Sequence, residues 1–160
     1  MLSQSLVKKL FEYADGKLYW RERASGTAPK GAEAGCVQGN GYRGITIRGR
    51  MYPAHRLIYL YHHGRLSAMI DHIDGDILNN RVENLRAATV RQNGANRKRG
   101  TNNSSGVKNV SWCKMARKWT VMVQKNKMQH YFGRYESLAE AADVARQARL
   151  KLLGEFARHE

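Results

Sequence analysis

The sequence lacks the patterns that mark membrane proteins, secreted proteins and cysteine-based zinc proteins. It contains no run of eighteen apolar residues, so no transmembrane helix is predicted. Its first seventeen residues contain no apolar segment followed by a small-residue cleavage site, so no signal peptide is predicted. The two cysteines, Cys36 and Cys113, are far apart and in no Cys-x-x-Cys pair, which excludes a four-cysteine zinc site and argues against a disulfide framework. We therefore expect a reduced, cytoplasmic protein.

Acidic residues are scarce as well. The chain of 160 residues has 28 Lys and Arg against 13 Asp and Glu, a net charge of +15. A charge of this size favours a polyanionic partner, with nucleic acid ahead of an anionic membrane surface. Residues 1–96 carry 14 basic and 8 acidic residues and residues 97–160 carry 14 and 5, which gives net charges of +6 and +9. Both halves are therefore expected to contact the polyanion.

Residues 1–50 predict a small α+β piece, an N-terminal α/β lead-in to the rest of the chain. Leu2, Leu6, Leu10 and Phe11 have helical spacing, and residues 18–22 alternate like a strand. Residues 24–41 are rich in glycine and predict a loop. Residues 42–53 predict a hairpin around Arg48–Gly49–Arg50, and residues 54–64 predict a helix that ends at Gly64.

The middle of the chain gathers acidic and amide side chains within a basic protein. Residues 69–86, MIDHIDGDILNNRVENLR, hold four acidic residues, one histidine and three asparagines. A short strand ending near Ile70 precedes Asp71 and His72, residues 84–89 alternate again, and residues 89–97 can form a short helix. Asn84 is expected to start the second strand and Asn93 to lie on the helix. The predicted order is strand, loop, strand, helix.

A purely structural interpretation of this segment stays open, because Asp, Asn and Gly are turn residues and the segment could be two ordinary loops. Asp74 and Asp76 are expected to be loop residues rather than further metal ligands. Asn79 and Asn80 are expected to hydrogen-bond loop backbone groups.

The last third predicts three strands followed by one helix. The strands are expected at 106–112, 117–125 and 128–135, and the helix at 137–154. Ser137 and Glu140 fit a capping box, and Gly154 closes the helix. The apolar helix face is rich in alanine, which permits close approach to a sheet. Residues 97–105, RKRGTNNSS, are basic and aperiodic and predict a linker.

The segment DHIDGDILNNRVENLR with the following RQNGANR resembles the HNH endonucleases in their ββα-metal form, most closely the homing endonucleases of phages and introns. The resemblance covers about 55–97 and implies cleavage of DNA with a divalent metal ion. His72 would be the general base, since imidazole titrates near neutrality. Asp71 and Asn93 offer hard oxygen ligands that suit Mg²⁺ or Mn²⁺ better than zinc. By the same resemblance, Asn84 would hydrogen-bond across the loop and fix the ring of His72.

Two residues at the start of the helix at 54–64 are candidate DNA contacts. His55 and Arg56 would lie where a helix N-terminus favours phosphate. Packing of His55 against the strand–loop–strand unit is an equally open alternative.

The segments GVKNVSW, KWTVMVQ and YFGRYESLAEAADVARQARLKLLGEFA resemble the AP2 DNA-binding domain over about 105–157. In that family a three-stranded sheet lies in the DNA major groove. On this pattern the DNA side of the sheet would hold Lys108, Val110, Trp112, Met122, Gln124, Gln129 and Tyr131. Gln124 and Gln129 could read adenine, Trp112 and Tyr131 could pack on sugars and base edges, and Lys108 and Lys118 could contact phosphates. A role in protein interaction or stability alone is the alternative for this unit.

The sequence thus predicts an α+β protein with an HNH domain at 1–96 (ββα-metal core at about 68–97), a linker at 97–105 and an AP2-like domain at 106–157. The predicted function is metal-dependent cleavage of double-stranded DNA, by a monomer, in the cytoplasm of a bacterial host if the protein is phage-encoded. Two alternatives are a DNA-binding regulator with an inactive HNH remnant and an RNA-binding protein.

Overall fold

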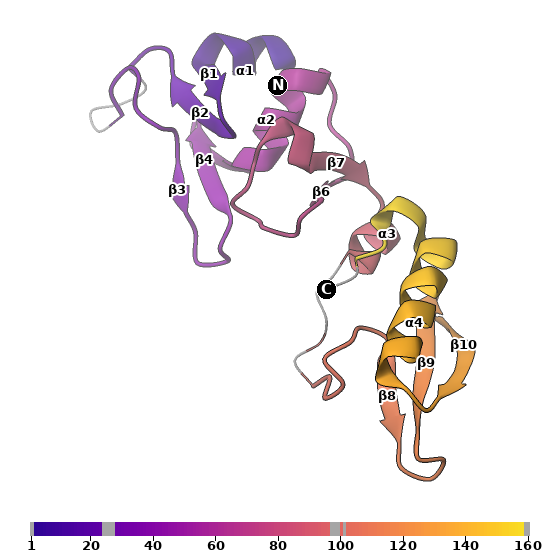
Figure 1. Cartoon of the computed structure of the whole chain (residues 1–160). Coiled ribbons are helices and arrows are strands. Elements are labelled where there is room, and N and C mark those ends of the chain that lie inside the picture. The colour runs from indigo at the N-terminus through magenta and orange to yellow at the C-terminus, as the bar shows by residue number, and fades with distance from the viewer. Residues whose placement is uncertain (1, 24–27, 97–99, 101, 159–160) are drawn as a thin grey trace. The chain divides into compact units, whose positions relative to one another are not determined.

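The computed structural model describes residues 2–23, 28–96, 100 and 102–158. The chain divides into two compact units, Met1–Thr89 and Val90–Glu160 (Figure 1). This division lies seven residues before the expected end of the first domain at residue 96, and it places the short helix α3 (Val90–Ala95) in the second unit. Of the expected linker at 97–105, residues 97–99 and 101 lie outside the described residues. No helix in the described ranges is long and apolar enough to cross a membrane.

The first unit begins with a helix and a tight hairpin. Helix α1 (Gln4–Leu10) starts at Ser3, whose hydroxyl accepts a hydrogen bond from the backbone N–H of Leu6. Strands β1 (Phe11–Ala14) and β2 (Lys17–Trp20) follow, joined by Asp15 and Gly16, both with positive φ. The prediction that Phe11 continues the helix was wrong. Asp-Gly at the two central turn positions is a strong hairpin signal, and it pairs Phe11 with Trp20.

A three-stranded sheet and one buried helix complete the frame of this unit. Strands β3 (Cys36–Val37), β4 (Arg43–Ile47) and β5 (Arg50–Pro53) pair in that order, and the predicted hairpin turns at Arg48 and Gly49. Helix α2 (Ala54–His63) ends at Gly64, whose φ of 70° is left-handed, as predicted. The core has α2 at its centre and includes Val7, Phe11, Leu18, Ile45, Leu57, Ile58, Ile70 and Leu85.

Two short antiparallel strands close the first unit. Strand β6 (Met69–His72) pairs with β7 (Leu85–Ala88), with Asp71 opposite Arg86 and His72 opposite Leu85. The loop between them ends in one 3₁₀ turn, η1 (Val82–Asn84). Asn84 therefore precedes the second strand instead of starting it.

The second unit is α3 followed by a three-stranded antiparallel sheet covered by one helix. Strands β8 (Val110–Cys113), β9 (Lys118–Lys125) and β10 (Met128–Tyr135) lie in the order β10-β9-β8. Helix α4 (Leu138–Leu153) starts at Ser137, whose hydroxyl accepts from the N–H groups of Ala139 and Glu140, and the turn η2 (Gly154–Phe156) follows it. Ala141 and Ala145 pack against Val110 and Val121 in the core. The second and third strands and the capped helix are confirmed, whereas the first strand begins at Val110, four residues later than predicted.

Candidate functional site

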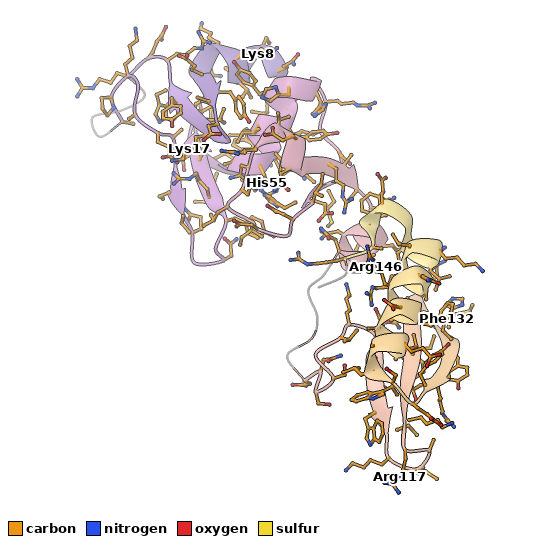
Figure 2. The ribbon with its side chains drawn as sticks, viewed as in Figure 1. Lys8, Lys17, His55, Arg117, Phe132 and Arg146 are labelled. Atoms are coloured by element: carbon orange, nitrogen blue, oxygen red, sulfur yellow. The ribbon has the colours of Figure 1, made fainter. Side chains whose placement is uncertain are left out.

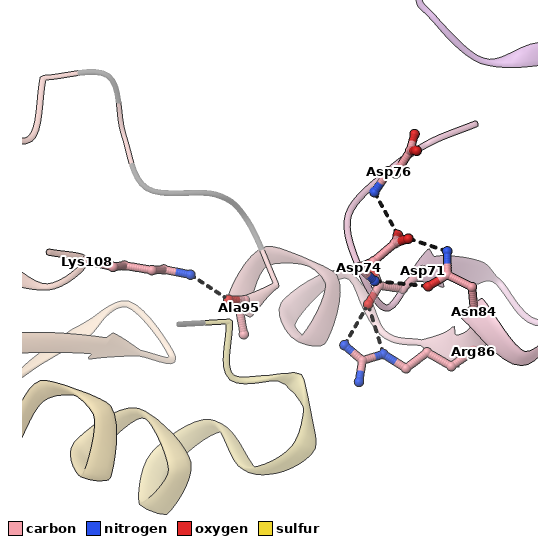
Figure 3. A network of polar contacts seen from close by, with 7 residues as sticks. All are labelled: Asp71, Asp74, Asp76, Asn84, Arg86, Ala95 and Lys108. Carbon is pink, nitrogen blue, oxygen red and sulfur yellow. Dashed lines mark hydrogen bonds and ion pairs between the residues drawn. The ribbon is translucent and has the colours of Figure 1, made fainter. Parts of the chain in front are cut away.

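The C-terminal end of β6 carries two buried polar side chains in succession. Asp71 and His72 are 4% and 5% exposed. Successive residues of a strand point to opposite faces, and the two side chains accordingly meet different neighbours. Oδ2 of Asp71 accepts from Nε of Arg86 at 3.0 Å and lies 2.9 Å from the Nη2 atom of the same guanidinium (Figure 3). The buried carboxylate thus lies beside a cation supplied by the paired strand.

The loop after His72 is held together by a carboxylate–amide network centred on Asp74 (Figure 3). The carboxylate of Asp74 accepts from the N–H of Asp76 at 2.8 Å, from Nδ2 of Asn79 at 2.6 Å and from Nδ2 of Asn84 at 2.9 Å. Partial burial acts to raise the pKa of Asp74, but these hydrogen bonds outweigh it and leave the pKa below its usual value. Asp74 therefore serves as the anionic hydrogen-bond acceptor that shapes the loop.

Asn84 closes the same network from the other end of the loop. Its Oδ1 accepts from the N–H of Asp74 at 3.0 Å, and its Nδ2 also donates to the carbonyl of Asn79 at 2.8 Å. These bonds cross the loop, as the resemblance implied. They do not reach His72, so the expectation that Asn84 fixes the ring of His72 was wrong.

The amide that faces His72 belongs to Asn80, whose role the sequence did not indicate. Nε2 of His72 lies 2.9 Å from Oδ1 of Asn80, and Asn80 is only 4% exposed. The pair Asn79–Asn80 looked like two equivalent loop amides. The structure separates them, because Asn79 bonds to Asp74 and Asn80 turns toward the histidine. Burial distinguishes Asn80 from Asn79, and burial depends on tertiary packing, which the sequence pattern does not show.

His55 lies on α2 (Figure 2). It is buried, and its ring packs beside that of His72. The two rings are 5.1 Å apart in an edge-to-face arrangement, and the ring of Tyr42 lies 5.4 Å from His55. Burial, with smaller contributions from the nearby charges of His72 and Arg56, lowers the pKa of His55 from 6.5 to about 4. His55 is therefore a neutral packing partner at pH 7. Arg56 donates to the carbonyls of Ser67 and Ala68, which anchors the segment that leads into β6.

The hairpin β1–β2 contacts the end of the loop, at residues 81–82. The hydroxyl of Tyr13 accepts from the N–H of Val82 at 3.1 Å, and Asp15 pairs with Arg81 at 2.7 Å. A Cβ atom added to Gly16 would lie 2.9 Å from the backbone nitrogen of Arg81, so the two backbones are in close contact there. The residues that follow Asn80 are thus fixed by the first strands of the chain.

Asn93, the other predicted metal ligand, is half-buried on α3 in the second unit. Its role as a ligand stays a prediction. Within the described ranges, no three or more His, Cys, Asp or Glu side chains gather as a metal site. The donor set that the sequence offers is one carboxylate and one amide. Hard oxygen donors that leave further coordination positions for water and phosphate oxygens fit Mg²⁺ or Mn²⁺.

The sheet of the second unit has one face away from α4, and the register identifies its side chains. Gln124 pairs with Gln129, Met122 with Tyr131 and Thr120 with Arg134. Residues that are directly opposite each other share a face, and Lys118 alternates onto the same face. Met122 and Tyr131 are exposed, whereas Thr120 is buried. The structure therefore brings Lys118, Gln124, Gln129 and Tyr131 together on one face.

Three other residues predicted for this face lie elsewhere. Val110 is only 2% exposed and pairs with Val121 in the core under α4. Trp112 pairs with Trp119, with ring centroids 4.9 Å apart, and so lies on the α4 side of the sheet. The register places Val110 and Trp112 on the opposite face from the family-based assignment, because they pair with Val121 and Trp119, which face α4.

Lys108 is the third residue, and it precedes β8. Its Nζ donates to the carbonyl of Ala95 at 3.0 Å (Figure 3). Burial, together with Arg149 and Arg158, lowers its pKa to about 8. Lys108 thus contacts the end of α3 within the second unit.

Comparison with known proteins identifies related chains. Residues 52–95 match the family described as HNH endonuclease. Protein 3.8 of Escherichia phage T7 is 40% identical over 89 residues, which are 56% of this chain and 73% of that protein. An uncharacterized HNH endonuclease, L560, of Acanthamoeba polyphaga mimivirus is 35% identical over 106 residues, which cover 64% of this chain and only about half (54%) of that protein. No solved structure gives a significant match.

Proposed function

The chain belongs to the HNH endonuclease family, and we propose that it is a metal-dependent endonuclease that hydrolyses phosphodiester bonds in double-stranded DNA. The observation that carries this proposal is the pair of buried side chains at the end of β6, a carboxylate and an imidazole in succession. A hydrogen-bonded loop follows them, and a second strand returns antiparallel. The proposal takes these elements as the strand–loop–strand part of a ββα-metal site, to which the family resemblance would add α3 as the helix.

Each side chain has a distinct part in the proposed hydrolysis. His72 accepts a proton from the attacking water, which a neutral imidazole can do near pH 7. Asp71 and Asn93 supply oxygen ligands, and Asn84 keeps the loop in shape through its bonds to Asp74 and Asn79. A bound Mg²⁺ or Mn²⁺ would supply positive charge for the phosphate and the leaving oxygen.

The second unit is proposed to target the nuclease to DNA as an AP2-like domain. Support comes from the three-stranded sheet backed by α4, and from the net charge of +9 over residues 97–160. Gln124 and Gln129 form one cross-strand pair on the face away from α4, where two amides could read base edges. Lys118, which also pairs with Glu136 at 3.2 Å, could contact phosphate.

The setting proposed for this activity is the cytoplasm of a phage-infected bacterial cell. The relatives include a phage protein and a viral HNH endonuclease. Within that setting we propose a role like that of a homing endonuclease, acting as a monomer with one active site per chain.

Plasmid cleavage tests the nuclease proposal. We expect the wild-type chain to nick supercoiled plasmid in the presence of Mg²⁺. Cleavage should stop when EDTA removes the metal ion. His72→Ala should lower the rate by about 10²–10⁴-fold, the usual loss of a general base, while DNA binding persists. His63→Ala, at the exposed end of α2, is the matched control and should cleave like the wild type. A wild-type chain that binds DNA but never cleaves it would instead support a DNA-binding regulator with an inactive site.

Binding measurements test the targeting proposal. Gln124→Ala should reduce the difference in binding free energy between the preferred and a mismatched DNA sequence by about 1–3 kcal/mol if the amide makes a bidentate base contact. Lys118→Ala should weaken binding to all DNA sequences by the same factor and reduce the salt dependence of binding. Competition with double-stranded RNA distinguishes DNA from RNA as the partner. Binding that does not depend on salt would contradict the proposal.

A further inference from the structure

We infer that Asn80 is the positioning residue of the active site: its amide oxygen accepts a hydrogen bond from Nε2 of His72 and holds the imidazole ring in one orientation. This role rests on the proposed nuclease function. It belongs to a residue that the sequence pattern did not distinguish from its neighbour Asn79.

The geometry of the amide determines which ring nitrogen carries the proton. Oδ1 of Asn80 lies 2.9 Å from Nε2 of His72, a normal hydrogen-bond distance. An amide oxygen can only accept a hydrogen bond, so Nε2 is the donor.

Burial makes this hydrogen bond selective. His72 and Asn80 are 5% and 4% exposed, so little water competes for the ring nitrogen. The opposite tautomer would place a lone pair against the amide oxygen and leave that buried acceptor without its donor, which costs more than the bond itself contributes. The ring is also restrained from the side by His55, at 5.1 Å.

The position of Asn80 is itself fixed independently of His72. On one side Asn84 donates to the carbonyl of Asn79, the preceding residue. On the other side the hairpin β1–β2 holds the following residues, through the pair Asp15–Arg81 and the bond from the N–H of Val82 to the hydroxyl of Tyr13. The amide of Asn80 is thus presented to the ring by backbone that is anchored at both ends.

Nitrogen NMR of the wild-type protein, labelled with ¹⁵N-histidine, tests the tautomer without any nuclease assay. The spectrum is recorded at about pH 8.5, above the ordinary pKa of free histidine. We expect one slowly exchanging imidazole N–H signal on Nε2 of His72, assigned by its absence from His72→Ala. A proton on Nδ1 of His72 would overturn the inference whether or not the protein cleaves DNA.

Three variants then test the consequence for catalysis. Asn80→Ala should lose the slowly exchanging signal and lower kcat by about 10–100-fold with KM for DNA unchanged, as loss of an orienting neighbour typically does. Asn80→Asp keeps an oxygen acceptor and should recover the signal and part of kcat. Asn79→Ala is the matched control, because it removes a loop hydrogen bond to Asp74 but leaves the contact to His72.

The outcomes separate this inference from the proposed function. If the wild type cleaves DNA and Asn80→Ala keeps both the signal and the wild-type kcat, the inference is wrong and the nuclease proposal stands. If the wild type does not cleave DNA, the nuclease proposal fails, while the NMR result still reports the tautomer. If Asn80→Ala does not fold, the wild-type spectrum and Asn80→Asp still decide.

Discussion

Replacing Arg86 with alanine removes the cation beside the buried carboxylate of Asp71. The two contacts, at 3.0 and 2.9 Å, both fall on Oδ2, and the side chains are 15% exposed for Arg86 and 5% for Asp71. Removing one partner of a buried ion pair costs about 3–5 kcal/mol. Because Arg86 retains some access to water, we expect the lower end of that range, about 3 kcal/mol of unfolding free energy.

A double-mutant cycle measures this pair. The unfolding free energy of the first unit is followed in urea, or by hydrogen exchange of the β6 and β7 amides, for Asp71→Ala, Arg86→Ala and the double variant. We expect a coupling energy of at least about 2 kcal/mol, within the range for residues in one buried network. Arg81→Ala is the matched control, since Arg81 pairs with Asp15 at the surface, where such a pair contributes about 0–1 kcal/mol.

Magnesium adds a second arm to the same experiment. If Asp71 is a metal ligand, Mg²⁺ should stabilise Arg86→Ala more than the wild type, because the ion replaces part of the missing positive charge. A ligand at 100 times its Kd stabilises the folded state by about 2.7 kcal/mol. A coupling energy below about 0.5 kcal/mol, the usual error of additivity, would refute the assignment of a buried ion pair here. Equal stabilisation of both proteins by Mg²⁺ would refute the link to the metal.

Three further predictions concern packing and protonation. The pKa of His55 is lowered to about 4, so the unfolded chain binds a proton that the folded chain does not. The contribution of neutral His55 to the unfolding free energy should therefore be complete above pH 6.5, and the unfolding free energy should fall by roughly 3 kcal/mol as the pH drops to about 4. His55→Phe should lack this part of the pH dependence in urea unfolding, and an unchanged slope would contradict it. Ala145→Leu should destabilise the second unit by about 1–3 kcal/mol through overpacking against the sheet, measured by its thermal transition; no change would contradict the close helix–sheet contact. Gly16→Ala should lower the unfolding free energy of the first unit in urea by about 1–2 kcal/mol, since a side chain at φ 79° is strained and its Cβ would meet the backbone of Arg81. An unchanged unfolding free energy would contradict the close contact between the hairpin and the loop.

Local signals in the sequence were sufficient for most of the second unit. The alternation of residues 117–135 and the capping serine predict β9, β10 and α4 almost to the residue, because these elements depend on near neighbours. The face of β8 was misassigned by analogy with a family. A strand's facing is set by cross-strand pairing, here Val110 with Val121, which a shift of one residue reverses.

The polar site was predictable in its residue types but not in its contacts. The pattern placed Asp71 and His72 correctly at the end of the first strand, whereas Asn84 lies in the turn η1 just before the second strand and not at its start. Which amide reaches the imidazole depends on how the loop folds over itself, and that depends on the hairpin β1–β2, about sixty residues earlier in the chain. The hairpin itself had a clear Asp-Gly signal, which the helical spacing of Leu6, Leu10 and Phe11 obscured.

The contacts between that hairpin and the loop limit how short a fragment can keep the proposed active site folded. The HNH match spans residues 52–95, yet Tyr13, Asp15 and Gly16 hold the backbone at 81–82. An excised 44-residue motif would keep every proposed nuclease side chain but would lose the contacts of the hairpin β1–β2 that hold its loop. Grafting this active site onto another scaffold would therefore require a substitute for the hairpin, with a glycine or an equally close backbone at the point of contact.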